Sequence, residues 1–274
     1  MTPVTKGYVD ITGGQVHYLC AGPQDGTPLV LLHATSDAAS MWEPALPVFG
    51  RLGYRAVAFD IPGHGNSFRP ESEPGANGYA AMMHEAVRAF GLERYHLLGH
   101  HFGGTVAGIL AADHPNSVRT LSVFGWNKIG GEWIKSIRAA KPREFGADGE
   151  TVRHHWVRRW EMSGRLLDDP AENRFSEALG LRTMIALLQA GKEWFWAYRA
   201  IGETDHAVLA GRIGCPVLLF AGPRDHLWQE SQDGVADFAN ARFVGMDWVG
   251  VDAVDEEPDL FCAVVDRFIR AENP

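Results

Sequence analysis

Apolar and polar residues alternate at the start of the chain and then give way to short, continuous apolar runs. The alternation over 8–11 and 15–21, interrupted by Thr12-Gly13-Gly14, predicts a β-hairpin. Continuous runs bounded by turn residues are typical of strands that are buried on both faces of a sheet. Such runs predict strands at 28–33, 55–61, 95–98, 121–124 and 216–221, and a last strand is expected at 241–249.

Segments with helical patterns separate these runs. Helices are expected at 41–52 and 80–90, and an amphipathic helix at 256–271 closes the chain. Strands that alternate with helices imply right-handed crossovers and a mostly parallel sheet. The pattern therefore predicts the α/β fold class.

Residues 127–207 break this alternation because they contain no convincing strand and several short helical patterns. We expect them to form a helical insertion after the sixth strand, in a body made of residues 1–126 and 208–274. Five of the nine tryptophans lie in the insertion: Trp133, Trp156, Trp160, Trp194 and Trp196. Tryptophans at helical spacing can pack the insertion onto the body or form the aromatic wall of a pocket, and both roles stay open.

The length and the net charge of the chain further restrict the classes of function that it can have. A chain of 274 residues suits one large α/β domain, and a net charge of −9 argues against nucleic acids and anionic membranes as partners. The N-terminus lacks a signal-peptide pattern, and no apolar run approaches the roughly 20 residues that span a bilayer. The three widely spaced cysteines are typical of free thiols in a reducing compartment. We expect a cytoplasmic monomer or homodimer that acts on a small molecule.

The most informative stretch is 95–104, Tyr-His-Leu-Leu-Gly-His-His-Phe-Gly-Gly. A buried strand ends near Leu98, Gly99 and Gly103 flank His101, and a helical pattern follows at once. Small residues two positions before and two positions after a turn allow a strand to pass abruptly into a helix. We therefore predict that His101 occupies the tip of this turn in a strained backbone conformation.

This stretch resembles the nucleophile elbow of the α/β-hydrolase family, Gly-x-Ser-x-Gly, with His101 in place of the serine. Three further segments resemble motifs of that family in the family's order: the loop at 31–35, the turn at 60–67 and the strand end at 219–225. The resemblance implies an α/β-hydrolase fold, a mostly parallel sheet flanked by helices, in which the insertion at 127–207 is a helical cap. It also implies that Asp225 is the catalytic acid, and that the backbone N–H groups of Thr35 and Phe102 form an oxyanion hole.

The chain departs from the family's pattern at a second position. The family's histidine is expected within 250–258, and counting back from Glu256 and Pro258 places Val251 there. No histidine follows His226. Serine-esterase chemistry requires a hydroxyl group activated by an imidazole. Since neither group stands where the family keeps it, we do not expect an ordinary serine esterase.

A first hypothesis makes His101 the catalytic group. Its ring reaches further than a serine hydroxyl, and Val251 leaves room for it to approach Asp225. A histidine oriented by a carboxylate suits a general base near neutral pH, for hydrolysis or for lyase-type proton transfer. We expect a small, largely apolar or aromatic carbonyl substrate and neither a cofactor nor a metal, since no metal-ligand spacing occurs. The predicted substrate contacts are Ala34, Trp126, Trp133, Trp156, Trp160 and Val251.

Two alternatives stay open. The protein could be a ligand-binding homologue that keeps the pocket without the triad, with His101 as a polar contact. The reactive group could also lie elsewhere, at Ser36, Asp37 or His100. Capping of a helix that starts near Ala38 is a simpler role for Ser36 and Asp37, and core packing is the simpler role for His100. The basic, aromatic segment 153–160 could meet an anionic substrate, but a solvent-exposed helix face is the simpler interpretation.

Overall fold

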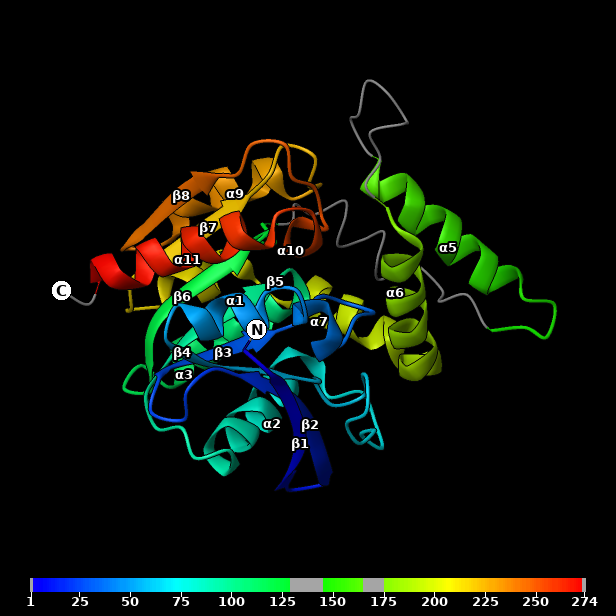
Figure 1. The fold of residues 1–274 in the computed structure, drawn as a ribbon, viewed down its shortest axis with the longest axis horizontal. Coiled ribbons are helices and arrows are strands. Elements are labelled where there is room, and N and C mark those ends of the chain that lie inside the picture. The colour runs from blue at the N-terminus through cyan, green and yellow to red at the C-terminus, as the bar shows by residue number, and fades with distance from the viewer. Residues whose placement is uncertain (1, 129–144, 165–174, 273–274) are drawn as a thin grey trace.

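A computed structural model describes residues 2–128, 145–164 and 175–272 (Figure 1). Eight strands form one sheet in the order β1-β2-β4-β3-β5-β6-β7-β8. Their bounds are β1 (Val4–Ile11), β2 (Gly14–Ala21), β3 (Thr27–Leu32), β4 (Tyr54–Phe59), β5 (Tyr95–His100), β6 (Val118–Phe124), β7 (Val217–Ala221) and β8 (Ala241–Gly245).

The pairing confirms the predicted hairpin and the predicted mostly parallel sheet. Strand β1 pairs antiparallel with β2, with Ile11 opposite Gly14, and β2 pairs antiparallel with β4. From β4 to β8 every neighbouring pair is parallel. The carboxyl ends of the parallel strands therefore meet at one edge of the sheet, where ligands bind in open α/β sheets.

Helices cover both faces of the sheet. The body contains η1 (Ala39–Trp42), α1 (Leu46–Arg51), α2 (Gly75–Ala89), α3 (Phe102–Asp113), α9 (Trp228–Gly234), η4 (Val235–Asp237), α10 (Ala253–Glu256) and α11 (Pro258–Glu272). The single helix predicted at 41–52 is in fact two, η1 and α1. Pro44 lies between them and has no backbone N–H to donate a helical hydrogen bond, whereas Pro47 is tolerated in the first turn of α1, where N–H groups have no helical partner.

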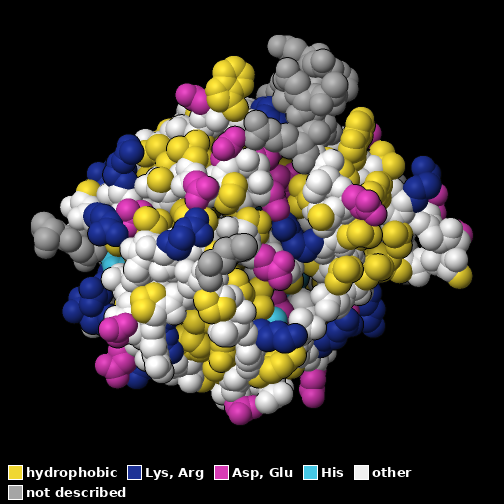
Figure 2. Space-filling model, viewed as in Figure 1, with side chains coloured by type: hydrophobic (Ala, Val, Ile, Leu, Met, Phe, Trp, Pro, Cys, Tyr) yellow, Lys and Arg dark blue, Asp and Glu magenta, His cyan; other side chains and the backbone are white. Residues whose placement is uncertain are grey.

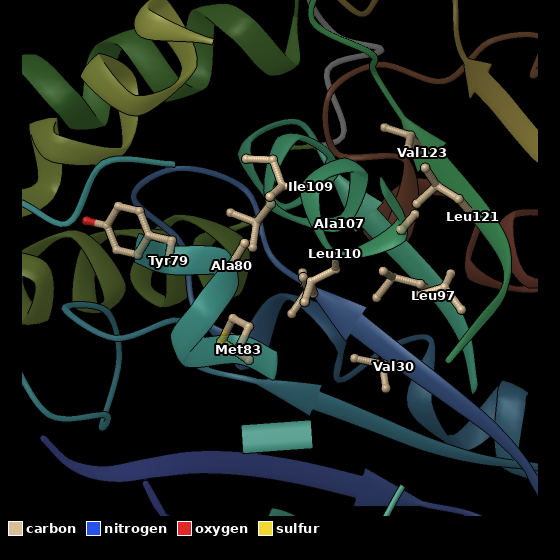
Figure 3. Close-up of a cluster of buried hydrophobic side chains, with 14 of the residues drawn as sticks. Val30, Tyr79, Ala80, Met83, Leu97, Ala107, Ile109, Leu110, Leu121 and Val123 are labelled. Atoms are coloured by element: carbon tan, nitrogen blue, oxygen red, sulfur yellow. The ribbon is translucent and has the colours of Figure 1, made fainter. Parts of the chain in front are cut away.

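Two hydrophobic cores lie on opposite sides of the sheet. Along β3, Val30 and Leu32 belong to the core beneath α2 and α3, and Leu29 and Leu31 to the core beneath α1 and α11. Figure 3 shows the first core, with strand residues such as Val30 facing side chains of α2 and α3. A strand buried on both faces needs apolar residues at every position. This explains the continuous apolar runs. The packing of the two cores also holds β5 and α3 in place on either side of His101.

Between β6 and β7, the described residues form helices only: α5 (Glu150–Ser163), α6 (Glu177–Ala190), η3 (Gly191–Phe195), α7 (Trp196–Glu203) and α8 (His206–Gly211). Helices α5 and α6 stand to one side of the sheet (Figure 1). Figure 2 shows hydrophobic side chains on the surface over α6, where Leu181, Ile185 and Leu188 are exposed. The predicted division at 127 and 207 stays a prediction, and α8 runs across its second boundary.

Two expectations about the environment of the chain can be compared with the structure. All three cysteines are free thiols. None of the helices in the described part of the chain combines the length and the hydropathy that a membrane span requires.

Candidate active site

His101 lies at the tip of a sharp turn between β5 and α3, as the glycine pattern predicts. Its backbone has φ 48° and ψ −106°, outside the regions that non-glycine residues favour. A Cβ atom at Gly99 would overlap the carbonyl of Gly103, and one at Gly103 would overlap the carbonyl of Leu32. Only glycine therefore fits at both flanking positions, and the strained turn is imposed by the packing of its neighbours.

The surrounding structure also holds the backbone of His101 by hydrogen bonds. Its N–H donates to the carbonyl of Phe124 at the end of β6, over 3.0 Å. Its carbonyl accepts a bond of 3.1 Å from Nδ2 of Asn127. Asn127 lines the cavity described below, and sequence reasoning missed it because nothing local links it to the elbow.

The side chain of His101 is bonded to Asp225, which follows β7. Nε2 of His101 lies 2.8 Å from Oδ2 of Asp225, and both side chains are buried. The backbone N–H of Leu227 donates to the other oxygen, Oδ1, over 2.7 Å. Burial favours the neutral acid, but the attraction and hydrogen bond of His101 outweigh it and lower the pKa of Asp225. An ionised carboxylate only accepts hydrogen bonds, so Nε2 carries the proton and Nδ1 the lone pair.

A glycine at the end of β6 gives the His101 ring its space. Gly125 has φ 72°, and a Cβ atom there would overlap both Cδ2 and Nε2 of the imidazole. The bond between His101 and Asp225 therefore depends on a third strand end, which lies between β5 and β7 in the sheet. Sequence reasoning missed Gly125, although it stands directly after the predicted sixth strand.

His226 is a further side chain that sequence reasoning missed, although it adjoins Asp225. Its ring lies perpendicular to that of His101, with the centroids 4.9 Å apart, and its Nδ1 is 3.6 Å from Oδ1 of Asp225. The ligand atoms of His101, Asp225 and His226 all lie within 4.8 Å of one another. Imidazole and carboxylate are ligands for divalent transition metals, so this trio is where a cation would bind if the protein held one. The expected absence of a metal stays a prediction.

A cavity of about 570 Å³ opens beside His101. This volume lies in the range of about 300–1,000 Å³ that small-molecule sites occupy. The body contributes Ala34, Thr35, Ser36, Asp37, Met41, His100, His101, His226 and Val251 to its wall, and Asn127 adds to it from the first position of the predicted insertion. Two of the predicted substrate contacts, Ala34 and Val251, and the predicted oxyanion donor Thr35 therefore line the cavity together with the predicted catalytic histidine.

The predicted tryptophan contacts lie elsewhere. Trp126 is fully buried in the core, where it packs edge-on against His206 at 5.3 Å. Trp156 packs against Phe175, and 46% of the surface of Trp160 is exposed to solvent. None of the three lines the cavity, and Trp133 lies outside the described residues.

Helix geometry explains this correction. Successive residues of an α-helix turn by about 100°. Because α5 turns His154, His155, Arg158, Arg159 and Met162 toward the cavity, Trp156 and Trp160 face other surroundings. The aromatic side chains that do line the cavity are Trp194, Phe195 and Tyr198, from η3 and α7.

The two predicted oxyanion donors occupy suitable positions. Phe102 is the first residue of α3, where N–H groups have no partner within the helix and the helix dipole favours negative charge. Its side chain is fully buried in the core, so only its backbone can serve the site. The N–H of Ala34 is bonded to the sulfur of Met41, which leaves Thr35 as the next donor along that loop. The role of both groups stays a prediction.

Comparison with known proteins places this geometry in a family. The family model described as alpha/beta hydrolase fold matches residues 27–258. The chain belongs to the α/β-hydrolase fold family. The chain is 26% identical to a fluoroacetate dehalogenase of Burkholderia sp. over 93% of its own length and 91% of the dehalogenase.

Solved structures share the fold of this α/β hydrolase. Epoxide hydrolase A of Mycobacterium thermoresistibile superposes with a TM-score of 0.78 at 19% identity and covers 98% of both chains. The enol-lactonase of Burkholderia xenovorans LB400 superposes with a TM-score of 0.79 at 18% identity, over 96% of this chain and all of the lactonase. At these identities the likeness concerns the fold.

A second histidine contacts the loop that carries Val251. Nε2 of His100 lies 3.1 Å from the carbonyl oxygen of Val251. Burial, together with the adjacent His101, lowers the pKa of His100 well below its ordinary value. His100 is therefore neutral at physiological pH and ties the loop to the elbow. It packs against Phe124, as expected of a core residue, and it also reaches the cavity wall.

The simple explanation offered for Ser36 and Asp37 is wrong. Helix η1 has Ala38 at its N-cap position, and no side chain caps it. Asp37 instead accepts a bond of 3.0 Å from the N–H of Ala38, and Ser36 has a positive φ of 61°. Burial raises the pKa of Asp37 to about 6, although the charges of Arg182 and Arg159 oppose the shift. Asp37 is thus a cavity-wall carboxyl that exchanges its proton close to neutral pH.

Asp37 should make stability depend on pH. Its pKa rises from 3.8 in the unfolded chain to about 6 in the folded one, so its favourable contribution is complete below pH 3.8 and is lost as pH rises through 6. A shift of about two units, at about 1.36 kcal/mol each, amounts to about 3 kcal/mol. Asp37→Asn keeps the acceptor for Ala38 and removes the titration. Urea unfolding should show that the variant gains stability relative to wild type between pH 4.5 and 7.5. A difference that stays constant across this range would contradict the burial of Asp37.

Proposed function

We propose that this α/β hydrolase is a cofactor-independent enzyme in which His101, oriented by Asp225, is the general base for a small carbonyl substrate. The observation that carries the proposal is the 2.8 Å bond between Nε2 of His101 and Oδ2 of Asp225, on the wall of the cavity. A strained backbone costs roughly 1–3 kcal/mol, which is more than a simple polar contact explains. That cost favours catalysis over the alternative, a ligand-binding homologue.

The geometry suggests how hydrolysis would proceed. Nδ1 of His101 takes a proton from a water molecule as the water oxygen bonds to the carbonyl carbon. Asp225 stabilises the imidazolium ion, and the N–H groups of Thr35 and Phe102 bind the developing oxyanion. When the intermediate collapses, the leaving group departs with the proton returned by His101. No covalent enzyme intermediate forms, so a serine at the elbow is not required.

The two ring nitrogens exchange the roles they have in Ser-His-Asp triads. In such triads the acid holds Nδ1 and the base is Nε2. Here the acid holds Nε2, because the histidine itself stands at the elbow and reaches toward the strand end that carries the acid. The same base could remove a proton from carbon in a lyase reaction. We favour hydrolysis because the dehalogenase relative and the structural neighbours named above are hydrolases.

A substrate panel tests this proposal. Aryl esters, lactones and β-keto acids should be assayed from about pH 5 to about pH 9, a range that spans the ionisation of imidazole. A general base must be neutral, so kcat/KM should rise with pH as the imidazole loses its proton and then level off. Preincubation with EDTA should leave kcat/KM unchanged. Activity that disappears with EDTA and returns with a divalent metal would assign His101, Asp225 and His226 to a metal site instead.

A further inference from the structure

We infer that the substrate carries a carboxylate group remote from the reacting carbonyl, and that Arg158 of α5 binds it. The inference rests on the proposed function of His101 and Asp225 and concerns the opposite end of the substrate. It identifies a class of compound, a monoanion with an apolar middle, rather than a neutral ester.

Helix α5 presents a basic stripe to the cavity. The lining residues His154, His155, Arg158, Arg159 and Met162 follow one another at the spacing of a single helix face. The exposed-face interpretation of segment 153–160 is therefore incomplete, since part of this face borders the candidate active site. The stripe places two guanidinium groups in reach of a bound ligand.

The two arginines differ in whether a carboxylate of the described residues neutralises their charge. Arg159 forms an ion pair with Asp252, which also accepts a bond from Ser163. Arg158 makes no hydrogen bond or ion pair with any other residue in the described ranges. Arg158 is exposed although it lines the cavity, so it lies where the cavity meets solvent. A ligand anion can bind there without displacing a protein carboxylate.

Charge around the cavity favours an anion. Asp37 is the one carboxyl among the described lining residues, which include two arginines, Arg158 and Arg159. Arg158 and Arg159 act electrostatically on the hydroxyl of Tyr198, whose pKa burial raises and the two positive charges lower. Both guanidinium groups therefore act on the α7 side of the cavity as well, in a chain whose net charge is −9. A cavity with a potential opposite to that of the rest of the protein concentrates anions.

The space between the two ends is apolar. Met184, Leu187, Trp194, Phe195 and Ile201 line the cavity from α6, η3 and α7. A ligand that spans from Arg158 to His101 would therefore place its carboxylate at α5, its hydrocarbon part along these side chains, and its carbonyl at the elbow. A guanidinium group binds a carboxylate through two parallel hydrogen bonds, which also orient the ligand.

The role of Arg158 also bears on the reaction. An arginine that holds a carboxylate stabilises the ground state, and so works against loss of that group as carbon dioxide. The carboxylate bound by Arg158 is therefore retained during the reaction. This favours hydrolysis of an ester or lactone of a dicarboxylic or oxo acid over decarboxylation.

Binding of unreactive probes tests the inference without any need for turnover. The probes are the monoamides of linear dicarboxylic acids from succinate to suberate, each paired with its neutral diamide, and calorimetry measures their affinities. The best monoamide should bind wild type about tenfold more tightly than its diamide, as expected for one charge-assisted hydrogen-bonded pair. This preference should shrink at high salt, because the arginine is exposed.

Matched variants locate the effect. Arg158→Gln should remove the preference for the monoamide, and Arg158→Lys should keep part of it. Arg153→Gln is the control, because Arg153 lies on the same helix, is exposed, pairs with Glu150 and does not line the cavity. Arg153→Gln should keep the full preference.

Two results would overturn the inference: equal binding of monoamides and diamides by wild type, including no binding of either, or an undiminished preference in Arg158→Gln. His101→Ala separates this inference from the proposed function. If that variant loses turnover and keeps the anion preference, both stand. If it keeps both turnover and the anion preference, Arg158 still binds a carboxylate and the proposed catalytic base is wrong.

Discussion

Replacement of His101 by alanine should lower kcat/KM by about 10²–10⁴-fold on whichever panel substrate the wild-type protein turns over, the range that a positioned general base contributes. The loss should appear in kcat, because proton transfer occurs in the transition state whereas apolar binding is shared with the ground state. The cavity keeps its aromatic wall in this variant, so KM should change little. Steady-state kinetics near the pH optimum measures both quantities.

His114→Ala is a matched control for this replacement. His114 follows the last residue of α3, at the opposite end of the helix from His101, and it stacks on His84 at 3.6 Å. His114→Ala removes the same type of side chain from the other end of α3 and should leave kcat/KM within about twofold of wild type, as expected for a site remote from the chemistry. If His101→Ala also retained wild-type activity, the base would have to lie elsewhere, and the cavity-wall carboxyl of Asp37 would become the first alternative.

The sequence predicted the body of the fold and the elbow because both depend on local rules. Strands buried on two faces are mostly apolar, so residues 29–32 of β3 and the whole of β7 stand out in the chain. The turn at His101 depends on glycines two residues away on each side, and these glycines can be identified from the sequence alone. Asp225 could be proposed as the acid because segment 219–225 resembles the family motif that carries the catalytic acid.

The sequence alone did not reveal which face of each inserted helix packs against the body. Trp156 and Trp160 lie four residues apart and share a face of α5, as an aromatic pocket wall would require. The packing of α5 turns the face with Arg158 toward the cavity instead. The choice between two amphipathic faces depends on contacts with residues far away in the chain, so the residue pattern of the helix alone does not determine it.

Gly125, at the end of β6, shows that long-range contacts also limit prediction within the body. Gly125 stands 24 positions after His101. Its contact with the His101 ring becomes apparent only once β6 is known to lie between β5 and β7 in the sheet. A serine side chain at the elbow would end before it reached this point. Gly125 and His101 are therefore expected to depend on each other, and this dependence can be measured.

Gly125→Ala should both destabilise the protein and inactivate it. Alanine at φ 72° costs roughly 1–2 kcal/mol through backbone strain alone. Its Cβ atom would also overlap Cδ2 and Nε2 of His101, so the ring must leave its bond with Asp225. Activity should therefore fall nearly as far as in His101→Ala, although the catalytic group is still present.

A double-mutant cycle isolates the contact from the strain. In a His101→Ser background the ring is absent, so Gly125→Ala should cost only its backbone strain, and urea unfolding of the four proteins should give a coupling energy of about 0.5–3 kcal/mol. Gly75→Ala is the strain control, because Gly75 has φ 64° and open space where its Cβ atom would lie. Equal costs of Gly125→Ala in both backgrounds would mean that the imidazole does not lie across the end of β6. That result would also contradict the bond between His101 and Asp225, because the same ring position produces both contacts.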